Sequence, residues 1–364
     1  MFTNITVIGL GIIGSSFCRA VKHVMPNTHI TGIDQDELIQ EVEKTDLVDR
    51  ALPASMLAEG CRSADLIVLA TPIQAALDLL PEIARHSSEN AVVTDVCSLK
   101  AQIVSQAQTL FSGKNGWFIG GHPMAGSEFS GFAHADPFLF QNAIYVLCPA
   151  AGVPEQSVRK LADLVHAIGA HGVLVQPDEH DRIAAAVSHL PQMLAVALMR
   201  YLALKNEHNP LYLKMAAGGF RDMTRIASSP FTIWRDICDG NREKISIELD
   251  GLIDVLTDLR QQLNEGNLEH AFEEAARTRL SIPRDTRGFL TNHFDVTVVV
   301  EDKPGIIARI ASPLAEAGIN IKDIQVLKVR ENEGGTLRLS FESEEKRMQA
   351  LAVLRESGLK CEKK

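Results

Sequence analysis

The chain has 364 residues, of which 46% are hydrophobic and 23% are charged, and its formal net charge is −10 at pH 7. This length is too great for one hydrophobic core, so we expect two or three domains. Because no cluster of Lys and Arg offsets the acidic charge, the composition argues against a nucleic-acid partner, and an anionic substrate would need a local cationic site.

The cysteines are scattered, with no C-x-x-C pair and none grouped with histidine at the spacing of metal ligands. They are Cys18, Cys61, Cys97, Cys148, Cys238 and Cys361. We therefore expect reduced thiols, a cytoplasmic location and no metal site. The N-terminus enters a strand pattern without a basic region and a long apolar core, so we expect no signal peptide. The longest apolar run, residues 183–204, contains polar residues and favours a buried helix over a membrane span.

The segment Gly9-Leu10-Gly11-Ile12-Ile13-Gly14 lies between a predicted strand, residues 5–8, and a predicted helix, residues 15–24. This is the G-x-G-x-x-G pattern in the strand–turn–helix context that dinucleotide binding requires. The first glycine allows a tight turn, the second lets the backbone approach a pyrophosphate, and the third lets helix pack on strand. We assign these glycines and Ile13 to cofactor binding; the alternative is a purely structural turn.

A second predicted strand, residues 29–33, ends in Asp34, close to the usual spacing of about 20 residues after the glycines. A carboxylate there can accept hydrogen bonds from both ribose hydroxyls and would repel a 2′-phosphate. Asp36 and Glu37 add negative charge nearby. The sequence therefore favours NAD over NADP.

Further strands are predicted over residues 66–70, 91–94, 117–119, 143–148 and 172–175, with helical stretches between them. This alternation is typical of an α/β fold, a Rossmann-type doubly wound parallel sheet with helices on both faces. Ligands of such sheets bind beyond the carboxyl ends of the strands. We expect one rim to hold the residues that follow strand ends, namely Gly9, Asp34, Thr71, Ser98 and His122.

His122 lies in Gly120-Gly121-His122-Pro123-Met124-Ala125-Gly126-Ser127-Glu128, where a glycine pair and a proline indicate a constrained loop. On a cofactor rim, this is a place for the general base of a hydride-transfer enzyme. The alternative is a histidine that only caps a backbone carbonyl. Ser98 could hold the hydroxyl or orient the imidazole, and it could also cap the helix predicted over residues 99–110. For Glu128, ordering the loop and reaching the helical domain remain alternatives.

From Asp178 the alternation stops, and helices are predicted as far as about Arg287. Apolar residues at helical spacing over residues 245–263 indicate a long amphipathic helix. A helical second domain of this kind commonly provides substrate contacts and a dimer interface, so we expect a homodimer.

Three residues of this helical region stand out. His189 lies in an otherwise apolar run, where it is either a hydrogen-bonded core residue or part of a site. Arg221 and Arg225 share one face if their segment is helical. They are then either solvated charges or a clamp for a carboxylate.

The C-terminal part shows another pattern after a linker marked by Pro283, Arg284 and Gly288. Strands are predicted over residues 294–300, 320–329 and 337–341 and around Lys360, and helices over residues 306–317 and 344–356. This order predicts a small ferredoxin-like βαββαβ domain. The predicted domains are therefore residues 1–177, 178–287 and 293–364.

Taken in order, these motifs resemble the prephenate dehydrogenase family. The resemblance rests on the glycine motif, on T-D-V-x-S-x-K at 94–100, on the histidine segment 120–128, on S-H-L-P at 188–191 and on residues 219–234. It implies an NAD-dependent oxidative decarboxylation of prephenate to 4-hydroxyphenylpyruvate, a step of tyrosine biosynthesis.

The resemblance also implies residue roles. His122 would accept the proton of the ring hydroxyl, with Ser98 bonded to the same centre, and Arg225 would bind a substrate carboxylate. The residues expected to shape the pocket are His189, Asp222 and Trp234.

This chain departs from the family at Gln192, where many members carry a second histidine close to the substrate. The choice between prephenate and arogenate, or activity on both, therefore stays open. A non-catalytic sensor of NAD and an amino acid is a further alternative, against which the intact His122, Ser98 and Arg225 argue.

The C-terminal D-K-P-G turn, residues 302–305, and G-I-N-I, residues 318–321, resemble an ACT domain, a regulatory module that binds amino acids. Gly305 and Asn320 would line its effector site, and tyrosine, the end product, is the expected inhibitor. The alternative is a tail that only aids dimerisation.

Overall fold

The computed structural model describes residues 1–112, 116–125, 131–281, 294–300, 303–330 and 334–363. These residues form two compact units, Met1–Ala271 and Phe272–Lys364. Several residues named above lie outside the described ones: Gly126, Ser127, Glu128, Pro283, Arg284, Gly288 and Asp302. The domain limits at 287 and 293 lie outside them too, and the boundary at 177 falls inside the first unit, so all three remain predictions.

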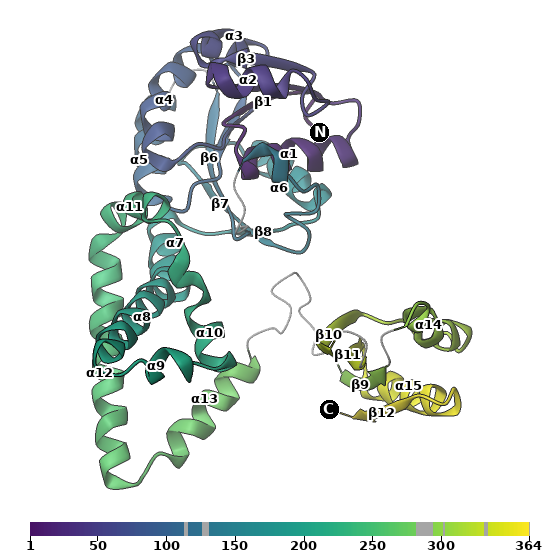
Figure 1. Ribbon diagram of the computed structural model, residues 1–364. Coiled ribbons are helices and arrows are strands. Elements are labelled where there is room, and N and C mark those ends of the chain that lie inside the picture. The colour runs from purple at the N-terminus through teal and green to yellow at the C-terminus, as the bar shows by residue number, and fades with distance from the viewer. Residues whose placement is uncertain (113–115, 126–130, 282–293, 301–302, 331–333, 364) are drawn as a thin grey trace. The chain divides into compact units, whose positions relative to one another are not determined.

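The first unit begins with a sheet whose described strands run in the order β3-β2-β1-β4-β5-β6-β7-β8 (Figure 1). The strands are β1 (Asn4–Ile8), β2 (His29–Asp34), β3 (Arg50–Pro53), β4 (Leu66–Leu69), β5 (Val92–Asp95), β6 (Trp117–Pro123), β7 (Ile144–Pro149) and β8 (His171–Leu174). The helices between them are α1 (Ile12–Val24), α2 (Asp36–Val42), α3 (Leu57–Arg62), α4 (Ile73–His86), α5 (Ala101–Phe111) and α6 (Glu155–Ala167). Short 3₁₀ turns cover Ala54–Met56 and Phe132–His134.

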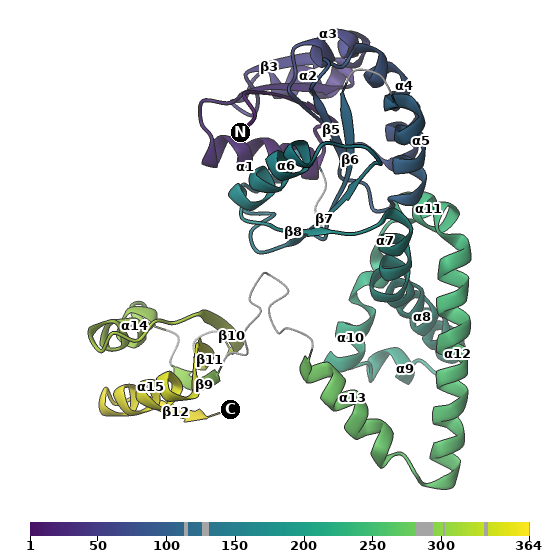
Figure 2. The same ribbon diagram turned by 180° about the vertical axis from the view of Figure 1, so that it is seen from behind.

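Apolar side chains form a separate core on each face of this sheet. On one face, residues of α1, α2 and α6, such as Phe17, Ile39 and Leu164, are buried against the strands. On the other face, α3, α4 and α5 contribute residues such as Leu80 and Ile103. The opposite views in Figures 1 and 2 show the same division. The predicted Rossmann-type fold, with helices on both faces, is confirmed.

The environment of His122 differs from the predicted loop. Strand β6 continues to Pro123, past the predicted end at Ile119, and it pairs antiparallel with β7, so that His122 lies opposite Val146. The described strands of this sheet therefore pair in parallel, as predicted, except for β6 and β7. The glycines have a packing role: a Cβ at Gly121 would lie 2.4 Å from the carbonyl oxygen of Asp95. The Gly-Gly-His-Pro sequence thus indicates close backbone packing rather than a turn.

The rest of the first unit is helical, as predicted. Its elements are α7 (Pro177–Ala184), a π-helical turn (Ala185–His189), α8 (Leu190–His208), α9 (Leu211–Lys214), α10 (Gly218–Thr224), a 3₁₀ turn (Arg225–Ser228), α11 (Phe231–Gly240) and α12 (Arg242–Glu265); α13 (Glu269–Ser281) follows. The predicted long helix is α12. The condition for a helix face shared by Arg221 and Arg225 is met only in part, because α10 ends at Thr224 and Arg225 begins the 3₁₀ turn.

The expectation of a buried helix in the long apolar run is also wrong for the single chain. Among the described residues, Pro177–His208 is the one helical stretch long and apolar enough to cross a membrane, and 28% of its most apolar window is buried. Large apolar side chains such as Val187, Tyr201 and Leu204 are exposed on it, as is Ile253 on α12. This part of the molecule therefore presents a broad apolar surface.

The second unit contains an antiparallel sheet in the order β10-β11-β9-β12. Its elements are β9 (Phe294–Val300), α14 (Ile306–Glu316), β10 (Asp323–Arg330), β11 (Gly334–Phe341), α15 (Glu344–Glu356) and β12 (Lys360–Lys363). Val296 and Val298 pack with Leu314 of α14 and Leu354 of α15 in one core. The ferredoxin-like prediction is confirmed, although β10 begins at Asp323 and not at Asn320.

Candidate active site

His122, at the end of β6, begins a chain of hydrogen-bonded side chains. Its Nδ1 lies 2.8 Å from Nε2 of His180, on α7. The Nδ1 of His180 lies in turn 2.8 Å from Oδ1 of Asp181. His180 and Asp181 are 3% and 2% exposed, so water does not compete for these bonds. These hydrogen bonds join the C-terminal end of β6 to α7, in the helical part of the same unit.

Asp181 is held in place by the start of another helix. The backbone N–H groups of Lys100 and Ala101, at the N-terminus of α5, donate to its two carboxylate oxygens over 2.8 and 2.9 Å. Burial alone would raise the pKa of Asp181, but the bond to His180 and these two backbone bonds lower it below its ordinary value. Asp181 is therefore an ionised acceptor.

This carboxylate determines where the protons of both histidines lie. Since an ionised carboxylate only accepts, Nδ1 of His180 donates to Asp181, and in the singly protonated ring Nε2 is left to accept. His122 must then donate its Nδ1–H to His180, which leaves the lone pair on its Nε2 directed away from His180. Burial, together with the charge of Lys100, holds the pKa of His122 well below its ordinary value. His122 is thus a neutral imidazole with one basic nitrogen, as a general base requires.

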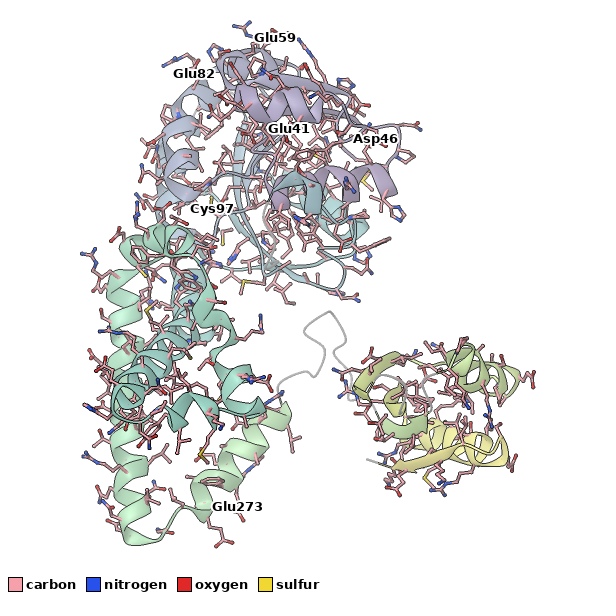
Figure 3. All side chains as sticks on the ribbon, viewed as in Figure 1. Glu41, Asp46, Glu59, Glu82, Cys97 and Glu273 are labelled. Carbon is pink, nitrogen blue, oxygen red and sulfur yellow. The ribbon has the colours of Figure 1, made fainter. Side chains whose placement is uncertain are left out.

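A buried ion pair between Lys100 and Asp95 supports this arrangement; both side chains are 0% exposed. Asp95 also accepts the backbone N–H groups of Cys97, over 2.9 Å, and Gly121, over 3.0 Å. It therefore ties the end of β5 to the residue that precedes His122. Cys97, labelled in Figure 3, lies on the segment that joins β5 to α5.

Ser98 lies half-buried on the same segment, between Cys97 and the ion-paired Lys100. The N-cap of α5 is Lys100, so the alternative role of Ser98 as the helix cap is wrong. Its predicted role toward a substrate hydroxyl remains a prediction.

His189 lies in the π-helical turn before α8 and is 1% exposed. Its ring meets Trp234 of α11 edge to face, with the centroids 5.9 Å apart, and its Nδ1 lies 3.3 Å from Nδ2 of Asn241. Burial lowers the pKa of His189 to about 4, although Asp181 acts against the shift. A charge on His189 would act on His122, so the two rings belong to one electrostatic site.

Gln192 is 3% exposed on α8, and its Nε2 donates to the carbonyl oxygen of Ile226 over 3.1 Å. This bond joins α8 to the 3₁₀ turn that starts at Arg225. Arg225 and Asp222 are themselves exposed. The structure therefore places half-buried His122 beside buried His180, Asp181 and His189, whereas Asp222 and Arg225 lie on the accessible surface.

The glycine turn before α1 fits a dinucleotide. Gly9 has a φ of +95°, and a Cβ at Gly14 would lie 1.9 Å from the carbonyl oxygen of Gly9, so both positions require glycine. A Cβ at Gly11 would meet nothing within 4 Å, which leaves open space at the start of the helix. Thr71 Oγ1, after β4, is buried without a hydrogen-bond partner among the described residues. An open backbone approach, a helix N-terminus and an unpaired hydroxyl are what a bound pyrophosphate would use.

Asp34, at the end of β2, holds this turn through hydrogen bonds. Its Oδ2 accepts the backbone N–H of Leu10 over 2.6 Å, and its Oδ1 accepts that of Gln35 over 2.7 Å. Each carboxylate oxygen can accept more than one hydrogen bond, so the predicted contact with ribose hydroxyls remains compatible with this geometry. Ile13, in the first turn of α1, is half-buried.

Residues assigned no role from the sequence complete the site: Lys100, His180, Asp181 and Asn241. The only local signal was the His-Asp pair at the start of a helix, within Pro177-Asp178-Glu179-His180-Asp181. An acidic first turn is ordinary at a helix start, so this pair did not indicate a partner for His122.

A Rossmann-type sheet with a glycine turn that fits a dinucleotide, beside a half-buried histidine of lowered pKa, is the architecture of a dinucleotide-dependent oxidoreductase. Three family models match the chain: the prephenate dehydrogenase nucleotide-binding domain over residues 17–174, the prephenate dehydrogenase dimerization domain over 176–277, and the ACT domain over 294–353. The chain belongs to the prephenate dehydrogenase family. The predicted family, enzyme class and ACT domain are confirmed.

Individual relatives agree. A prephenate dehydrogenase of Bacillus subtilis is 37% identical over 96% of this chain and 95% of its own length. The structure of Aquifex aeolicus prephenate dehydrogenase in complex with hydroxyphenyl propionate and NAD+ matches with a TM-score of 0.70 and 26% identity, over 78% of this chain and 99% of that one. Synechocystis arogenate dehydrogenase matches with a TM-score of 0.66 and 30% identity, over 76% and 97%.

Proposed function

We propose that this protein is a cytoplasmic, NAD-dependent prephenate dehydrogenase that converts prephenate to 4-hydroxyphenylpyruvate in tyrosine biosynthesis. The observation that carries the proposal is the chain of hydrogen bonds from Asp181 through His180 to His122, from which we infer that Nε2 of His122 is the basic nitrogen. It lies in the same unit as a glycine turn that fits a dinucleotide.

The residues of the turn would hold NAD. Gly11 admits the pyrophosphate, Thr71 Oγ1 offers an unused hydrogen bond, and Asp34 accepts from the ribose. When bound, NAD supplies a nicotinamide ring that accepts a hydride. The first predicted contacts to the cofactor therefore all come from the ends of β1, β2 and β4.

The reaction removes a hydride and carbon dioxide from the substrate ring. His122 Nε2 accepts the proton of the ring hydroxyl while the hydride leaves the carbon that bears it. The ring carboxylate then departs as carbon dioxide, its bonding electrons complete the aromatic ring, and His122 returns the proton to the phenolic oxygen. Prephenate and NAD+ thus give 4-hydroxyphenylpyruvate, carbon dioxide and NADH, with no net proton released. A positioned base of this kind contributes roughly a hundredfold to ten-thousandfold.

The substrate itself would be held from the helical side. Arg225 binds a carboxylate, Ser98 donates to the hydroxyl centre, and Trp234 forms a wall of the pocket beside His189. Asp222, exposed on α10 three residues before Arg225, would help to shape the pocket. Aromatisation supplies the driving force, so the protein has mainly to align these groups.

Arogenate, or both compounds, is the second candidate substrate. Gln192 is the observation that favours it, because a neutral amide replaces the second histidine and is held by Ile226 with its oxygen still able to accept from an ammonium group. Initial rates of NADH formation on the two compounds separate the candidates. A higher kcat/KM for prephenate supports the main proposal, and a higher value for arogenate replaces it.

The ACT domain would bind tyrosine and inhibit the enzyme. Gly305, with a φ of +87°, forms the turn into α14, and Asn320 is exposed between α14 and β10. Both lie in the connections of the second unit, where a small effector can reach backbone groups. The exposed apolar side chains of α8 and α12 support a homodimer formed through the dimerization domain.

A further inference from the structure

Asn241, in the turn between α11 and α12, is fixed at both its backbone and its side chain. Its backbone N–H donates to Ile237 over 3.0 Å, and its carbonyl accepts from Ile245 over 3.0 Å. The residue is 2% exposed. Its Nδ2 lies 2.8 Å from the carbonyl oxygen of Asp181 and 3.3 Å from Nδ1 of His189. The side chain therefore stands between His189 and the residue that anchors His180.

The partners determine which way the amide faces. A carbonyl oxygen only accepts, so the group beside Asp181 O must be the NH₂ of Asn241 and not its oxygen. The second hydrogen of that NH₂ is then directed at Nδ1 of His189, which has to accept it. The Oδ1 of Asn241 stays buried without a partner among the described residues. An unpaired buried oxygen is unfavourable, so the orientation is maintained by the two donated bonds.

We propose that Asn241 is a positioning residue that fixes His189 as the neutral tautomer with its proton on Nε2, so that His189 meets the substrate as a hydrogen-bond donor. The ligand atom it suits is an oxygen acceptor, a carboxylate or a hydroxyl oxygen. The role toward substrate rests on the proposed function, whereas the tautomer rests on the hydrogen bonds of the protein alone.

The surroundings of His189 agree with a neutral donor. The titratable groups that act on it are Asp181 and His180 of α7, and burial outweighs the attraction of Asp181, so that the pKa of His189 falls to about 4. A cation at this position would oppose proton uptake at His122, on which its charge acts. A neutral Nε2–H donor avoids that conflict and still supplies one directed bond. Asp181 anchors both arrangements, His180 through its carboxylate and Asn241 through its carbonyl.

The tautomer is measured by ¹⁵N NMR of the histidine rings in the full chain, with His189→Gln used to assign the signals. The expected result is an unprotonated Nδ1 and a protonated Nε2 in the unaltered protein, and a loss of this preference in Asn241→Ala. A proton on Nδ1 of His189 in the unaltered protein overturns the proposal, and so does an unchanged tautomer in a folded Asn241→Ala. If that variant does not fold, the tautomer of the unaltered protein still decides.

Kinetics give the second readout. Asn241→Ala is expected to raise KM for the substrate roughly tenfold while kcat stays within about threefold, because one directed hydrogen bond is weakened. Adding Asn241→Ala to His189→Gln is expected to raise KM no further, since both changes remove one interaction. Ile245→Val, a neighbouring buried change on α12, is the control and is expected to leave KM unaltered. Additive effects in the double variant, or an equal rise of KM in the control, overturn the proposal. Failure of the proposed function would appear instead as no turnover of either compound with the tautomer unchanged.

Discussion

Nδ1 of His122 lies 2.8 Å from Nε2 of His180, although 58 residues separate the two histidines in the sequence. One ring stands at the end of strand β6 and the other on α7, whose Asp181 is bound by the first N–H groups of α5. Three elements, β6, α7 and the start of α5, therefore together hold the ring of His122. We expect a change that moves α7 to displace the hydrogen-bond partner of His122.

His180→Asn tests this link. Without the acceptor at Nε2 of His180, His122 is no longer held in the tautomer that leaves its own Nε2 basic, so kcat/KM on prephenate should fall roughly tenfold to a hundredfold. Affinity for NAD should stay within about twofold. His166→Asn, an exposed histidine of α6, is the matched control and should have no effect. Full activity in His180→Asn would show that the contact is structural only.

Stability should depend on pH through the buried histidines. The pKa of His189 is lowered from 6.5 to about 4, so between these values the unfolded chain binds a proton that the folded chain does not. The contribution of His189 to the free energy of unfolding is then complete above pH 6.5. It decreases as the pH falls toward 4, by up to about 1.4 kcal/mol per pH unit. His122, whose pKa is lowered too, adds to the slope. Urea unfolding midpoints across this range provide the measurement.

The control for the pH experiment is His189→Gln, which cannot titrate. Its unfolding midpoint should change less between pH 6.5 and pH 4 than that of the unaltered chain. Identical pH dependences would mean that His189 is not held neutral by the fold.

Two substitutions in the glycine turn should separate cofactor binding from folding. A Cβ at Gly11 meets nothing within 4 Å, so Gly11→Ala should fold normally and weaken NAD binding by roughly tenfold or more, because the methyl group occupies the approach of the pyrophosphate. Gly14→Ala should instead destabilise the protein, since its Cβ would lie 1.9 Å from the carbonyl oxygen of Gly9. Thermal unfolding and NAD titration measure the two effects. Normal NAD affinity in Gly11→Ala would argue against this placement of the cofactor.

The regulatory proposal is tested by Asn320→Ala in the full chain. The concentration of tyrosine that halves the initial rate should rise about fivefold or more, because the change removes the proposed contact between Asn320 and tyrosine. The uninhibited rate should stay unchanged, because Asn320 lies in the second unit. Glu316→Ala, an exposed residue at the end of α14, is the control. Equal inhibition of the unaltered chain and Asn320→Ala would place tyrosine elsewhere, with the active site as the first candidate.

The sequence predicted features that depend on neighbours along the chain. Buried strands such as Leu66–Leu69 show as continuous apolar runs, and the glycine turn carries its constraint in each residue, as the φ of Gly9 confirms. The short strand Arg50–Pro53 was missed because only Leu52 in it is buried. Local pattern carries little information for so short an edge strand.

Features that depend on distant partners could not be predicted in the same way. From the sequence alone, the glycine pair before His122 indicates a turn. In the structure a Cβ at Gly121 would lie 2.4 Å from the carbonyl oxygen of Asp95, which shows that the glycine allows close packing. The link from His122 to His180 joins two elements with no shared pattern. The apolar face of α8 is exposed in the single chain, and the sequence could not predict this. The composition of a helix does not distinguish a face buried in its own chain from one that contacts another protein.

The proposed role of His122 as the base is tested by the initial rate of NADH formation from prephenate in the unaltered chain and in His122→Asn, with NAD affinity measured alongside. We expect turnover in the unaltered chain and a fall of about a hundredfold or more in the variant, because the variant lacks the basic Nε2 of His122. NAD affinity should be nearly unchanged. Turnover of prephenate by His122→Asn at the rate of the unaltered chain would exclude His122 as the base.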